Sequence, residues 1–163
     1  MEEFLNRLHP AVVHFPIALL LAAALFELAG LLKPGWRLRG AASWALGLGA
    51  LGALAAAAVF HPNPQVEGLP FAGLFEWHEI LAWCTVALAL PLAALRFWLL
   101  RKGPEPLEHG LGRWGFAAGL VLVAALVGGA GYCGGQLVFE HGLGVTAPMP
   151  APLPAAPAGT AVP

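Results

Sequence analysis

Histidine is the residue type in this 163-residue chain that offers the most chemistry. A neutral imidazole binds haem iron, zinc and copper through a ring nitrogen. Five of the six histidines lie near the ends of long apolar segments: His9, His14, His61, His78 and His141. Ligation of a haem iron or a metal ion is therefore the chemistry to test. It requires that the apolar segments bring several imidazoles together.

The composition of the chain identifies these segments as membrane spans. Hydrophobic residues make up 59% of the chain and charged residues only 10%, and the mean hydropathy is +0.76. A soluble domain carries about 25% charged residues, so this chain cannot cover its surface in water. Four apolar stretches reach the ~20 residues that cross a bilayer. We expect an all-α, four-helix transmembrane bundle with helices at about 12–32, 41–60, 74–100 and 114–141.

The domain organisation is simple. Residues 1–145 form one transmembrane domain, and the Pro- and Ala-rich residues 146–163 are expected to be a disordered tail. The leader carries Glu2 and Glu3 where a signal peptide needs positive charge, so the first segment is expected to stay as a span. A net charge of -1 provides no basic face for nucleic acid.

The basic residues predict the orientation of the chain. Six of the eight Lys and Arg residues fall in the first and third loops: Lys33, Arg37, Arg39, Arg101, Lys102 and Arg113. By the positive-inside rule these loops are cytoplasmic, and both termini face outward. The chain is thus expected to be a multi-pass protein of the bacterial cytoplasmic (inner) membrane. His9, His14, His61, His78 and His141 then all lie near the outer face.

The depth of two histidines favours a bound cofactor. His14 and His78 fall about one turn inside their segments, where a polar side chain is costly without a partner. Our leading hypothesis is a b-type haem in electron transfer, with His14 and His78 as axial ligands. His9 and His141 are second ligands or orienting residues, and His61 is a further candidate ligand. The chain has no Cys-x-x-Cys-His motif, so covalent c-type attachment is excluded.

Two other hypotheses remain open. The same histidines suit a zinc- or copper-binding membrane module. Glu76, Glu79 and Glu140 are candidate additional ligands in that case, but the favoured interpretation of these glutamates is rim residues solvated by headgroups. The third hypothesis is a cofactor-free subunit that packs through its glycine faces against a redox protein, a membrane complex or a second copy. No nucleophile–base pair is visible, which argues against an enzyme.

Other polar residues have simpler interpretations. Glu27 and Arg96 have similar depths in the first and third segments, so we expect them to pair. Cys84 and Cys133 also share a depth, and they either pack as small apolar residues or form a disulfide. Pro10 suits the first turn of a helix, and Gly142 suits a left-handed helix stop.

Three motifs resemble those of a known bacterial membrane-protein family. Residues 8–19 read LHPAVVHFPIAL, residues 76–79 read EWHE, and residues 134–145 read GGQLVFEHGLGV. Together they resemble the family called domain of unknown function 2231, over about residues 5–145. The resemblance implies a four-helix integral membrane domain, joined in some relatives to cytochrome-like or redox modules. The positions that match the family motifs are His9, His14, His78 and His141.

Overall fold

Four long helices make up the described fold. The computed structural model describes residues 2–32, 36–60, 66–102 and 111–143, and these residues contain no strand. The helices are α1 (Glu2–Leu32), α2 (Trp36–Ala58), α3 (Ala72–Arg101) and α4 (Leu111–Phe139). By length and composition each can cross a membrane. The all-α, four-helix prediction is confirmed, whereas the tail at 146–163 lies outside the described residues.

The first helix begins well before the apolar segment at 12–32. Pro10 and Pro16 both lie inside α1, so the expectation that Pro10 occupies the first turn was wrong. The physical reason is that an apolar run marks only the part of a helix that meets hydrocarbon, and a polar stretch can continue the same helix. At the end of α4 the expectation holds. Gly142 has a φ of 66°, in the left-handed region that favours glycine.

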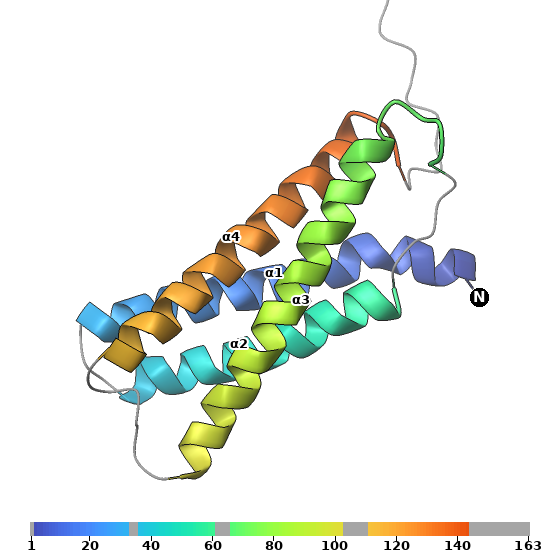
Figure 1. Ribbon diagram of the computed structural model, residues 1–163. Coiled ribbons are helices and arrows are strands. Elements are labelled where there is room, and N and C mark those ends of the chain that lie inside the picture. Colours follow the sequence, from blue (N-terminus) through green and yellow to red (C-terminus); the bar gives the residue numbers. More distant parts are fainter. Residues whose placement is uncertain (1, 33–35, 61–65, 103–110, 144–163) are drawn as a thin grey trace, which may run out of the picture.

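The helices form two hairpins that cross one another (Figure 1). α1 packs along α2, and α3 packs along α4, while α2 also contacts α3 and α1 contacts α4. α1 therefore lies diagonally opposite α3. We call the end of the bundle with His9 and His78 the histidine end. The opposite end, with Arg101 and Arg113, is the basic end.

The centre of the bundle is filled by small and aliphatic side chains. Large apolar side chains instead cover the outside, which suits a surface in contact with lipid rather than water. Fully buried residues of the central core include Leu20, Ala23, Leu46, Ala50, Ala89, Leu120 and Val123. Exposed ones include Phe15, Leu25, Trp44, Leu51, Trp83, Trp98, Leu122 and Phe139.

Glycines of α2 allow the helices to approach closely. A Cβ atom added to Gly49 would lie 2.9 Å from Cγ of Leu20 and 3.2 Å from Cβ of Leu19, both on α1. A Cβ on Gly47 would lie 2.7 Å from the Phe97 ring of α3. Small residues at these two positions are what tight helix packing in a bilayer requires.

This packing gives a direct stability prediction. We expect Gly49→Ala to lower the free energy of unfolding by about 1–3 kcal/mol, because α1 and α2 must separate to fit the methyl group. Gly40→Ala is the matched control on α2, since a Cβ there meets nothing within 4 Å. Thermal unfolding in detergent, followed by circular dichroism, measures the difference. Equal stability of the two variants would contradict the close approach at Gly49.

Candidate functional site

His78 is the best-anchored histidine of the structure. It lies in the second turn of α3 and is half-buried against α4. Its Nδ1 donates a hydrogen bond to the Ala130 carbonyl oxygen, 2.8 Å away. A carbonyl can only accept, so Nδ1 carries the proton and Nε2 of the neutral ring keeps its lone pair. Such a backbone bond fixes the tautomer and ring orientation of a metal-ligating histidine.

A glycine of α4 provides the room for this ring. A Cβ added to Gly134 would lie 3.1 Å from Cε1 and 3.2 Å from Nδ1 of His78. Any side chain at this position would therefore press on the imidazole. Gly134 and the Ala130 carbonyl lie one helical turn apart, and together they hold the ring from one face of α4.

The second imidazole of the site comes from the diagonally opposite helix. His9 of α1 is half-buried, and its ring centroid lies 6.4 Å from that of His78. The two ring planes are nearly perpendicular, at 79°. α1 and α3 do not pack directly on each other. The two half-buried rings therefore meet in the space between these helices at the histidine end. We call His9 and His78 the histidine pair.

The other predicted histidines have different surroundings. His14 is exposed, and its Nδ1 donates to the Pro10 carbonyl oxygen of its own helix. His141 is also exposed and stacks on Phe71, with centroids 4.8 Å apart and ring planes at 22°. The structure therefore brings His78 together with His9, and the axial role of His14 stays a prediction. His61 lies outside the described residues.

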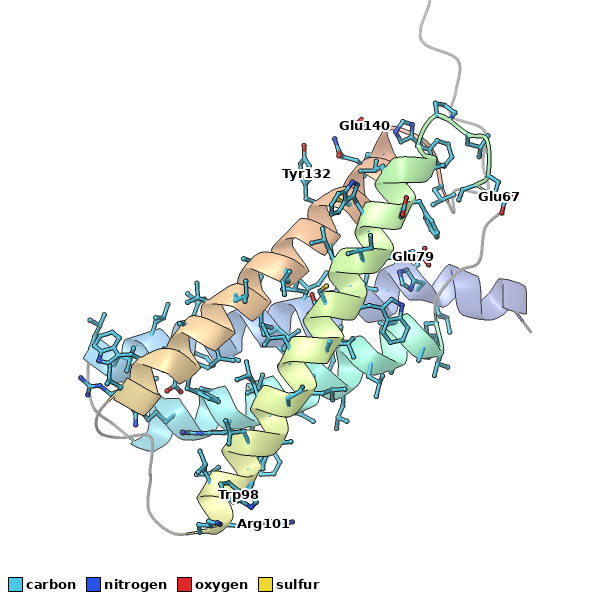
Figure 2. All side chains as sticks on the ribbon, in the orientation of Figure 1. Glu67, Glu79, Trp98, Arg101, Tyr132 and Glu140 are labelled. Carbon is cyan, nitrogen blue, oxygen red and sulfur yellow. The ribbon has the colours of Figure 1, made fainter. Side chains whose placement is uncertain are left out.

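Acidic residues and thiols lie around the histidine end. Glu76 is exposed and Glu79 is half-buried, whereas Glu140 is exposed and accepts a bond from Gln136. Figure 2 shows Tyr132 and Glu140 projecting from this part of α4. Within the described ranges, no three His, Cys, Asp or Glu side chains are grouped closely enough to hold a metal ion. Both cysteines, Cys84 and Cys133, are free thiols.

A second polar cluster lies at the basic end. Glu27, Arg39, Ser43 and Arg96 are all buried there, on three different helices. Arg96 Nε donates to Ser43 Oγ at 2.9 Å, and Ser43 Oγ donates to the Arg39 carbonyl at 2.7 Å. Arg39 was expected in a loop, but it lies inside α2 and is only 4% exposed. Ser43, which lies one helical turn after Arg39 in an otherwise apolar stretch, is the feature of the sequence that could have indicated a buried polar cluster here.

The contacts that position His78 against Ala130 and Gly134 can be tested without assuming any ligand. We expect Gly134→Ala to displace the ring, weaken its bond to Ala130 and lower the free energy of unfolding by about 1 kcal/mol. Gly135→Ala is the matched control, because a Cβ there meets nothing within 4 Å. Nitrogen NMR of labelled histidine reports whether the proton stays on Nδ1. An unchanged His78 signal in Gly134→Ala would contradict the role of Gly134 in positioning the His78 ring.

The fold and its four apolar helices define a multi-pass integral membrane protein. Within that class the chain belongs to the family described as "Predicted membrane protein (DUF2231)", whose model matches residues 6–147. The family suggested by the sequence is thereby confirmed. No curated protein and no solved structure matches the chain.

Proposed function

We propose that the histidine pair holds a b-type haem and that the protein takes part in electron transfer. The observation that carries the proposal is the close approach of His9 and His78 from two different helices, with ring centroids 6.4 Å apart. A ligating nitrogen lies about 2.0–2.1 Å from its metal. Two imidazoles this close together could both bind one metal ion or one haem iron.

The number of ligands favours haem over zinc. A b-type haem in a helical bundle needs only one or two axial side chains, since the macrocycle supplies the remaining ligands. A structural zinc site needs four ligands, and a catalytic one needs three. In the part of the chain that the structure describes, the histidine pair has no third His, Cys, Asp or Glu grouped with it at ligating range.

The chain's own residues have defined roles in this proposal. The Ala130 carbonyl keeps the proton on Nδ1 of His78 and directs the Nε2 lone pair toward a ligand. Gly134 leaves space for the imidazole. The apolar centre of the bundle excludes water from one side of the site, and such burial tunes the potential of a haem. When bound, haem supplies reversible one-electron chemistry.

The orientation of the site is part of the proposal. Arg101, Lys102 and Arg113 all lie at the basic end of the bundle. Because basic flanks stay in the cytoplasm, the histidine pair would face the outer side of a bacterial cytoplasmic membrane. A partner that exchanges electrons with this site would then approach from the outer leaflet or from the space beyond it.

An absorption spectrum with metal analysis tests the proposal. The full chain is expressed with haem precursor supplied, purified in detergent and reduced with dithionite. We expect a Soret band that sharpens on reduction, at about one haem per chain. Stoichiometric zinc or copper without this band would overturn the haem proposal in favour of a metal module. Absence of haem and metal after reconstitution would leave a cofactor-free subunit.

A further inference from the structure

The buried cluster at the basic end has a composition that is unusual for a membrane interior. It contains two guanidinium groups and one carboxylate, with Arg96 1% exposed, Arg39 4% and Glu27 0%. The formal charge of these side chains is therefore positive by one. Moving a charged group out of water costs several kcal/mol, so buried charges need partners. In a membrane span such residues are candidates for a functional site.

The contacts of Arg96 hold its guanidinium in one orientation. Nε donates a hydrogen bond to Ser43 Oγ at 2.9 Å, and the Ser43 hydroxyl donates to the Arg39 carbonyl oxygen. The Cζ atom lies 5.6 Å from the centroid of the Phe116 ring, so an aromatic face covers one side of the group. Nη2 is buried and makes no hydrogen bond to any residue that the structure describes. The guanidinium of Arg96 is thus held in place, and its Nη2 can still donate a hydrogen bond.

The depth of the cluster places it close to one surface of the membrane. Glu27 and Arg96 lie about one and a half turns before the ends of α1 and α3. α3 has 30 residues, which span ~45 Å, whereas the hydrocarbon core is ~30 Å thick. The cluster therefore lies near the boundary where phospholipid phosphates and water begin. Figure 2 shows Trp98 and Arg101 at this same end of α3.

We propose that the cluster at the basic end binds a phosphate-type oxyanion through Arg96. Arginine presents N–H donors in a planar fork that matches phosphate oxygens, and charge-assisted bonds of this kind are strong. The bound anion would neutralise the excess charge and accept a bond from Nη2. Inorganic phosphate and the phosphate of an anionic phospholipid share this chemistry. The proposal does not depend on haem binding at the histidine end.

Thermal unfolding of the detergent-purified full chain tests this site. One arm adds inorganic phosphate against chloride at equal ionic strength, and the other adds phosphatidylglycerol against phosphatidylcholine. We expect one arm to raise the melting temperature of the wild type in a saturable manner. A response to phosphate identifies a free oxyanion, and a response to phosphatidylglycerol alone identifies a lipid phosphate. Absence of a saturable response in both arms would overturn the proposal.

Two variants and one control assign the effect to Arg96. Arg96→Lys keeps the charge but loses the planar fork, and we expect about tenfold weaker binding of the anion that responds. Ser43→Ala removes the hydroxyl that orients the guanidinium, and it provides a milder test if Arg96→Lys folds poorly. Arg101→Gln removes an exposed cation of the same end and should leave the affinity unchanged. Equal loss in Ser43→Ala and Arg101→Gln would indicate a nonspecific charge effect and overturn the site.

Discussion

His78→Ala is expected to retain about a tenth or less of the haem bound by the wild-type chain. His78 is the imidazole whose Nδ1 is fixed by the Ala130 carbonyl, so its loss removes the oriented ligand of the histidine pair. Removing only an outer partner of a metal ligand costs about 10–100-fold in affinity, and loss of the ligand itself costs at least as much. The ratio of Soret to protein absorbance measures the effect.

Three further histidine variants locate the second ligand. His9→Ala should also lose most of the haem, because its ring lies 6.4 Å from that of His78. His14→Ala and His141→Ala are controls, since both rings are exposed and have contacts of their own. Loss of haem in His14→Ala with retention in His9→Ala would instead support the His14–His78 axial pair expected from the sequence. Full haem retention in His78→Ala would remove the site altogether.

Glu27→Gln is expected to lower the free energy of unfolding by about 3–5 kcal/mol, the typical cost of removing one partner from a buried ionic cluster. Glu27 is fully buried, and no other Asp or Glu among the residues that the structure describes is buried. Without it, Arg39 and Arg96 remain buried as two like charges. The change keeps the shape of the side chain, so the loss reports electrostatics rather than packing.

A matched control separates this effect from the general loss of a carboxylate. Glu76→Gln makes the same chemical change at an exposed position of α3, where surface substitutions usually alter stability by less than about 0.5 kcal/mol. Chemical or thermal unfolding in the same detergent compares the two variants. If Glu27→Gln were as stable as Glu76→Gln, the basic-end cluster would not contribute to the fold as an ionic unit.

The two polar clusters occupy opposite ends of the bundle and have different chemistry. Between them lies the apolar core around Leu20, Leu46 and Leu120. A proton path through a membrane protein uses chains of ionisable groups, whereas this core is built from aliphatic side chains. The two proposed sites therefore lie apart, one at each end of the bundle. The proposed electron transfer then takes place at the histidine end alone.

The sequence by itself determined the class of protein and the number of helices. Apolar stretches of about 20 residues can only be helices in lipid, because no water is present to bond a free backbone. The cations then predicted which helix ends lie together. Gly142 also gave a correct helix stop, since a positive φ favours glycine regardless of the rest of the fold.

Only the tertiary structure decided which histidines meet. His9 and His14 lie on the same helix, His9 just before the apolar segment at 12–32 and His14 just inside it, and periodicity did not show which of the two is buried. The packing of the bundle leaves His9 half-buried beside His78 and His14 exposed. The burial of Arg39 likewise depended on where α2 begins and on the close approach of Gly30, whose added Cβ would lie 3.1 Å from Arg39 Cγ. Which side chains of two diagonally opposite helices come into contact depends on the angles at which the helices pack, and no local sequence pattern encodes those angles.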